Sequence, residues 1–234
     1  MSGLLLSTRF VLEGPCTEMP RTLRGSKDVC AFDFDGTLVD SMGAFADIAG
    51  ALIARERGLE TGRARQMYLD TSGLPFFQQL DLLFPGDPRN AALADRFERD
   101  KLAGYFTREY FPDAGSTITA LGAAGLKVAV CSNNTQENVS RFVAQHSVRF
   151  DHVLGFREGF SKGAEHFEHI RRREGLSLEQ MVFVGDSIRD GEKTLAYGID
   201  FIARTGTFTA EQFRGRFPDV LVIDALAELV DILV

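Results

Sequence analysis

The chain of 234 residues is long enough for one large domain, or for one domain with a smaller insertion. Its composition, 44% apolar and 25% charged, is typical of globular proteins, and a net charge of −7 without a basic run argues against nucleic acid and anionic membranes as partners. Apolar stretches are too short to span a membrane, and the amino terminus lacks the apolar region of a signal peptide, so we expect a cytoplasmic protein.

The amino-terminal segment, residues 1–27, precedes the first predicted core strand. Three interpretations stay open for it: a loose tail, an extra edge strand around RFVLEG, or an over-long start. The next segment, VCAFDF at 29–34, is a continuous apolar run without alternation, which is typical of a parallel strand that is covered on both faces. Cys30 in this run and Cys131 in a later one are predicted to be buried thiols rather than disulfide partners.

The segment from 42 to 112 contains no convincing strand. MGAFADIAGALIARERG and RNAALADRFERDKLAGYFTREYF both have the apolar faces of helices, and SGLPFF and FPGDP break the pattern between them. We therefore predict an all-helical insertion, a cap, over 42–112. Within it YLDTSGLPFFQQ, 68–79, is the candidate specificity loop, with plain packing between helices as the alternative.

After the insertion, short apolar strands alternate with helical patterns. This alternation predicts βαβ units and an α/β fold with a doubly wound, mostly parallel, Rossmann-like sheet, built from 28–41 and 113–234. Such sheets bind ligands beyond the carboxyl ends of their strands. The predicted strands are 126–132, 152–156, 181–186, 200–204 and 220–224, and the clearest helices are 137–146, 164–175 and 225–234.

Two aspartates end the first strand. Asp33 and Asp35 are two residues apart, so in an extended strand their carboxylates point to the same side, where they would repel each other. A divalent cation would relieve this, and Mg²⁺ prefers such hard oxygen ligands. Gly36 permits a tight turn whose amide can approach an anion, and Thr37 adds a hydroxyl. The DFDGT segment therefore predicts a phosphate cradle beside a metal.

Other polar residues follow later strands. Ser132 ends the strand VAVCS, where its hydroxyl could hold a phosphate oxygen, although Ser and Asn are also common helix caps. Lys162, in GFSKGAEHF, could supply a compact positive charge. Asp186, in VFVGDSIRD, could complete a metal site, while Asp190 could contact the metal shell through water, brace Lys162 or cap a helix.

These motifs resemble those of the haloacid dehalogenase (HAD) superfamily, in particular phosphoglycolate phosphatase-like hydrolases with a helical cap. The resemblance covers roughly residues 28–234 and includes all four motifs of that superfamily in order. They are matched by DFDGT at 33–37, Ser132, Lys162, and the acids Asp186 and Asp190.

The resemblance implies a Mg²⁺-dependent phosphatase that acts on a small phosphorylated metabolite. Asp33 would attack phosphorus and form an aspartyl phosphate, and Asp35 would protonate the leaving alcohol and then activate water. The metal would be held by Asp33, the backbone carbonyl of Asp35 and Asp186, with Asp190 nearby. The phosphate would be held by the following residues: Gly36, Thr37, Ser132, Asn133 and Lys162.

Four other activities compete with this interpretation. A dehalogenase of the superfamily lacks the second aspartate, and a phosphonate hydrolase uses a cap lysine near the start of the insertion, whereas Lys101 is late in the segment. A sugar phosphomutase is the main enzymatic alternative, although no histidine lies in 42–112. The alternative from another class is a non-catalytic phosphate-binding or phospho-acceptor module. The sequence indicates neither the substrate nor the oligomeric state.

Overall fold

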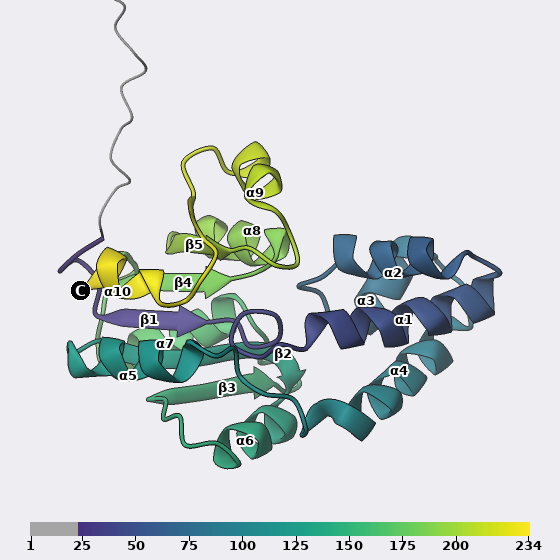
Figure 1. The fold of residues 1–234 in the computed structure, drawn as a ribbon, viewed down its shortest axis with the longest axis horizontal. Coiled ribbons are helices and arrows are strands. Elements are labelled where there is room, and N and C mark those ends of the chain that lie inside the picture. The colour runs from purple at the N-terminus through teal and green to yellow at the C-terminus, as the bar shows by residue number, and fades with distance from the viewer. Residues whose placement is uncertain (1–22) are drawn as a thin grey trace, which may run out of the picture.

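The core of the protein is a single parallel sheet. A computed structural model describes residues 23–234, and in these residues six strands lie in the order β3-β2-β1-β4-β5-β6, each parallel to its neighbours (Figure 1). The predicted α/β doubly wound sheet is confirmed, whereas the possible edge strand around RFVLEG lies outside the described residues. The strands are β1 (Val29–Phe32), β2 (Lys127–Thr135), β3 (His152–Phe156), β4 (Met181–Gly185), β5 (Asp200–Arg204) and β6 (Leu221–Ile223).

Both faces of this sheet are buried, which explains the unbroken apolar runs. In β1, Cys30 and Phe32 belong to one hydrophobic cluster, while Val29 and Ala31 belong to a second cluster on the opposite face. The helices that pack on the first face are α5 (Ala114–Ala123), α6 (Gln136–Ala144) and α10 (Glu228–Leu233). Those on the second are α7 (Ala164–Glu174), α8 (Ile188–Tyr197) and α9 (Ala210–Arg216). Cys30 and Cys131 are buried free thiols, as predicted.

The insertion between β1 and β2 consists of helices and no strand. It lies beyond the carboxyl ends of the strands, at the right of Figure 1. Two connections join it to the core and pair with each other, because the amide of Phe111 donates to the carbonyl of Leu38 at 2.8 Å and Val39 forms a bridge with Tyr110. The helices are α1 (Met42–Arg57), α2 (Thr61–Asp70), α3 (Phe76–Leu83) and α4 (Asn90–Tyr105).

In the insertion, one loop and one helix are shorter than the sequence predicted. The predicted specificity loop, 68–79, is helical at both ends, and only 71–75 lie between α2 and α3. The helical pattern over 89–111 ends at Tyr105, because the chain beyond it must turn back to pair with the connection from β1. Among the described residues, none of the helices combines the length and apolar character needed to cross a bilayer.

Candidate active site

The DFDGT segment extends β1 and then turns sharply. The amide of Asp33 still donates to the carbonyl of Val184 in β4, at 2.8 Å, so the strand continues to this residue. Gly36 has a φ of +86°, and a Cβ at this position would lie only 2.8 Å from the carboxyl carbon of Asp186. Glycine is therefore required here, both by the backbone conformation and by the close approach of the acid.

Three carboxylates, from the ends of β1 and β4 and from the first turn of α8, meet beside this turn. Asp33, Asp186 and Asp190 are 6%, 2% and 1% exposed, and one oxygen from each lies within 4.8 Å of the others. Burial raises the pKa of Asp33 well above its usual range, and burial together with the charge of Asp190 raises the pKa of Asp186 to about 6. The hydroxyls of Thr37 and Thr207 donate to Asp186 and fix its orientation.

Lys162 is the buried cation of this cluster. Its ammonium lies 2.8 Å from Asp33 and 2.6 Å from Asp190, and its side chain is 4% exposed. Burial alone would lower the pKa of Lys162, but the charges of Asp190 and Asp33 outweigh this and raise it. Ser187 donates to the second oxygen of Asp190 at 2.6 Å, so this acid is held on both sides. Lys162 therefore lies between Asp33 and Asp190.

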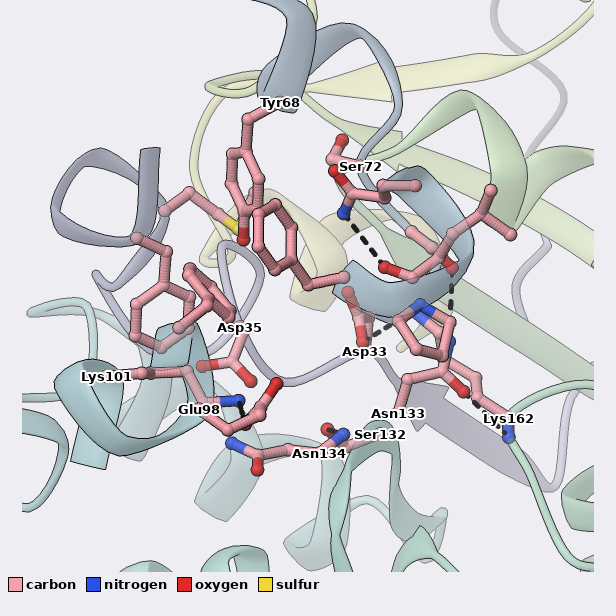
Figure 2. Close-up of a pocket in the computed structure, with 18 of the residues that line it drawn as sticks. Asp33, Asp35, Tyr68, Ser72, Glu98, Lys101, Ser132, Asn133, Asn134 and Lys162 are labelled. Atoms are coloured by element: carbon pink, nitrogen blue, oxygen red, sulfur yellow. Dashed lines mark hydrogen bonds and ion pairs between the residues drawn. The ribbon is translucent and has the colours of Figure 1, made fainter. Parts of the chain in front are cut away.

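Asp35 lies apart from the three clustered acids. Its carboxylate accepts a hydrogen bond from Ser41 at 2.8 Å. Burial raises the pKa of Asp35, which favours its protonated form at higher pH than an exposed aspartate. In Figure 2 it lies on the same side of the pocket as two residues of α4, Glu98 and Lys101. Two aspartates two residues apart therefore have different surroundings.

Polar residues at the end of β2 connect the core to the insertion. Ser132 is 2% exposed, and its hydroxyl accepts from the amide of Asn134 at 3.0 Å. The side chain of Asn133 donates to the carbonyl of Gly73 at 3.1 Å and accepts from the amide of Lys162 at 3.3 Å. Asn133 thus joins the predicted phosphate-binding lysine to the loop between α2 and α3.

A cavity of about 90 Å³ separates the acids from the insertion (Figure 2). The core side is lined by Asp33, Asp35, Ser132, Lys162 and Asp186, so most of the predicted site residues share one space. Asp190 contacts Lys162 but does not line the cavity. The side formed by the insertion includes four aromatic side chains, those of Phe45, Tyr68, Phe76 and Phe97.

Sequence reasoning missed one charged pair in this pocket. Lys101 pairs with Glu98 at 2.5 Å, and both line the cavity. Lys101 follows Phe97 and precedes Tyr105 at four-residue spacing, so it falls on the buried stripe of α4. A lysine within an apolar stripe is the signal that could have identified it. The late position of Lys101 in the segment, which counted against a phosphonate hydrolase, does not keep it out of the pocket.

The fold and the clustered acids define a protein with a Rossmann-like α/β core and a helical insertion over an acidic site. Comparison with known families agrees, since the family described as haloacid dehalogenase-like hydrolase matches residues 30–204. The chain belongs to the haloacid dehalogenase-like hydrolase family. The expected family, the fold and the assignment as a hydrolase are therefore confirmed.

Individual relatives agree with this assignment. A phosphoglycolate phosphatase of Salmonella choleraesuis is 29% identical over 223 residues, covering 82% of this chain and 86% of that protein. One from Synechococcus elongatus is 26% identical over 192 residues, covering 77% of this chain and 85% of that protein. Among solved structures, a HAD family hydrolase from Deinococcus radiodurans with bound phosphate and sodium has a TM-score of 0.63 at 22% identity, covering 87% of this chain and 93% of that one.

Proposed function

We propose that this hydrolase is a Mg²⁺-dependent phosphatase that cleaves a small phosphomonoester through an aspartyl phosphate on Asp33. The observation that carries the proposal is the meeting of Asp33, Asp186, Asp190 and Lys162 in one buried cluster at the base of a pocket. The names of the curated relatives support phosphatase chemistry, and a structural neighbour that binds phosphate supports a phosphate site in this fold.

The acidic cluster suits a hard divalent cation. Carboxylate oxygens are the ligands that Mg²⁺ prefers, and the raised pKa values of Asp33 and Asp186 reflect buried charges that a cation would stabilise. We assign the metal to Asp33, Asp186 and the backbone carbonyl of Asp35. Asp190 is occupied by Lys162 and Ser187, which favours a bracing role over direct ligation. When bound, Mg²⁺ would offset the negative charge of the phosphate ester.

Different residues of the chain would carry out the nucleophilic attack, the proton transfers and the binding of the phosphoryl oxygens. The carboxylate of Asp33 attacks phosphorus, the bond from phosphorus to the leaving oxygen breaks, and Asp35 gives that oxygen a proton. Water next attacks the phosphorus of the aspartyl phosphate, Asp35 takes up the proton, and Asp33 is released with inorganic phosphate. Ser132 and Lys162 would hold the transferring oxygens. The amides of the turn at Gly36 and Thr37, and the amide of Asn133, would assist them.

The size of the pocket favours a small substrate. A cavity of about 90 Å³ corresponds to the volume of roughly three waters at ~30 Å³ each. This suits a phosphate group with a short organic part. We propose that 42–112 acts as a cap that excludes water from the reaction, while 28–41 and 113–234 form the catalytic core. The cap residues that line the cavity come from α1, α2, α3, α4 and the loop between α2 and α3.

Turnover separates this function from its two alternatives. A phosphomutase would share the acids, but histidine is absent from the described residues that line the pocket. A phospho-acceptor module would keep phosphate without turnover. We expect the protein to release phosphate from p-nitrophenyl phosphate repeatedly with Mg²⁺, to stop with EDTA, and to lose at least about 10³-fold in kcat in Asp33→Asn. Stoichiometric retention of phosphate would favour the acceptor module, and conversion between sugar phosphate isomers would favour the mutase.

A further inference from the structure

The buried lysine of α4 has two partners in its own helix, the carboxylate of Glu98 and the ring of Phe97, and it also lines the pocket. Lys101 is 7% exposed, and its ammonium lies 5.5 Å and 5.6 Å from the ring centroids of Phe45 and Phe97. A charge in such surroundings loses hydration, and a leucine would pack there at lower cost. Figure 2 shows Lys101 beside Asp35, at the border of the pocket.

The hydrogen-bonding capacity of this ammonium is largely unused. An ammonium has three donors, and Lys101 uses one of them on Glu98. The other two have no hydrogen-bond partner among residues 23–234. Glu98 itself is 46% exposed in its side chain, so the ion pair has one buried and one partly hydrated member. Unused donors on a buried cation that lines a pocket indicate a binding site for an anion.

The position of Lys101 indicates which part of a substrate it would meet. The other lysine of the pocket, Lys162, is already held between two acids and belongs to the phosphoryl site. Figure 2 shows Lys101 beside Asp35, and both residues line the cavity. Lys101 is therefore close to the proposed general acid, which must reach the oxygen of the leaving group.

We infer that Lys101 determines the specificity for the leaving group, because its ammonium binds a carboxylate carried by the leaving alcohol. This inference rests on the proposed phosphatase function. Glu98 is the counter-ion that the substrate carboxylate replaces at Lys101. Because the cavity is small, the carboxylate must lie within a few bonds of the ester oxygen, as in a short phosphorylated hydroxy acid.

The test compares two esters of equal size and different charge. Phosphoglycolate carries a carboxylate, and its carboxamide isostere replaces that group with a neutral amide. We expect Lys101→Met to reduce kcat/KM for phosphoglycolate by roughly 10- to 100-fold, which is the usual value of a charge-assisted hydrogen bond, and to change the carboxamide by less than about threefold. Lys101→Arg, which keeps the charge, should retain most of the preference for the carboxylate.

Two further variants separate charge recognition from general damage. Glu98→Gln removes the competing carboxylate and should lower KM for phosphoglycolate by about two- to fivefold while leaving KM for the carboxamide unchanged. Lys127→Met is the matched control, because Lys127 forms a lysine–aspartate pair with Asp151 at the opposite end of β2, away from the pocket. Its effect on either ester should stay within about twofold.

The inference is overturned if Lys101→Met reduces both esters equally, or if the unmodified protein shows no preference for the carboxylate while hydrolysing both. Reductive trapping of Lys101 by borohydride with phosphonoacetaldehyde would also overturn it, because the amine would then serve as a covalent catalyst. If the protein hydrolyses no phosphate ester at all, the proposed function itself is wrong. The two failures are therefore distinguishable.

Discussion

At the scale of single residues, three buried carboxylates share one ammonium. Asp33, Asp186 and Asp190 lie within 4.8 Å of one another, and Lys162 contacts two of them. Burying like charges costs free energy of folding unless a cation compensates them, and one lysine cannot balance three acids. The cluster therefore lowers the free energy of unfolding of the metal-free protein, and this destabilisation has measurable consequences.

The first consequence concerns stability without metal. The pKa of Asp186 is raised from 3.8 to about 6, so the folded state holds this proton more tightly than the unfolded state. The stability due to this group is then greatest below about pH 4 and is lost as the pH rises through about 6. Asp186→Asn removes the charge, and we expect the metal-free variant to be about 1–3 kcal/mol more stable at about pH 7.5, measured by thermal unfolding with EDTA.

The experiment on Asp186→Asn needs a control variant and a second measurement with Mg²⁺ added. Asp95→Asn changes an exposed aspartate of α4 and should stay within about 0.5 kcal/mol of the unmodified protein. Adding Mg²⁺ should stabilise the unmodified protein but not Asp186→Asn. A variant that is less stable without metal and still stabilised by Mg²⁺ would contradict the assignment of Asp186 as a ligand.

The second consequence is a pH dependence of metal binding. Protons and Mg²⁺ compete for Asp186, because a carboxylate must be ionised to bind the metal. Because the pKa of Asp186 is about 6 and the pKa of Asp33 is also raised, the apparent affinity for Mg²⁺ should fall by at least about tenfold per pH unit well below 6. Calorimetric titration across this range measures it. An affinity that stays flat down to about pH 4.5 would show that Asp186 does not bind the metal.

At the scale of elements, the loop between α2 and α3 fastens the insertion to the core. The carbonyl of Gly73 accepts from Asn133, and a Cβ on Gly73 would lie 2.8 Å from Cβ of Arg189 and 3.2 Å from Cβ of Ser187. The φ of this glycine is +86°. The loop thus docks against the first turn of α8, next to the acids, and its backbone must approach closely to do so.

Gly73→Ala should therefore disturb the docking of the cap. The added methyl group cannot fit against α8 without moving the loop, so we expect kcat/KM to fall by about 10-fold or more. Gly86→Ala is the matched control, because Gly86 also has a positive φ, +71°, but nothing lies within 4 Å of its Cβ position. Equal kinetic effects of the two substitutions would show that backbone strain, and not docking, is responsible.

Sequence patterns predicted the elements where one face or both faces carry a clear apolar signal. The strand at 152–156 and the helices α1 and α7 lie within a residue of expectation, because continuous apolar runs and 3.6-residue periodicity depend on local burial. The extent of α4 was wrong, since Tyr105 ends the helix where the pairing of Tyr110 with Val39 requires a return to the core. That pairing joins segments far apart in the chain.

In the candidate site, too, some residues could be predicted from local sequence patterns and others could not. Asp33, Ser132, Lys162 and Asp186 each follow a strand or precede a helix in a recognisable motif, and parallel strands bring such ends together. Lys101 and Glu98 belong to no motif, and their place in the pocket depends on how the insertion is oriented over the sheet. Local patterns contain no information on that orientation.

At the scale of the whole molecule, core and insertion form one continuous hydrophobic body. A single buried cluster includes Phe34 and Phe142 of the core together with Tyr105 and Phe45 of the insertion. Arg204, at the end of β5, adds a polar link, because it donates to the carbonyl of Gly36 at 2.9 Å and its guanidinium lies 3.7 Å from the ring centroid of Phe111. Both connections between the two parts are thereby fixed beside the acids.

The central claim is that this whole assembly directs Asp33 at phosphorus. The most direct measurement is to quench the protein in acid during turnover of a phosphate ester with Mg²⁺ and to locate the phosphoryl group by peptide mass spectrometry. The account predicts one phosphoryl group on the Asp33 peptide, removed by hydroxylamine and absent from Asp33→Asn. Sustained turnover without any phosphorylated Asp33, or turnover that persists in Asp33→Asn, would contradict it.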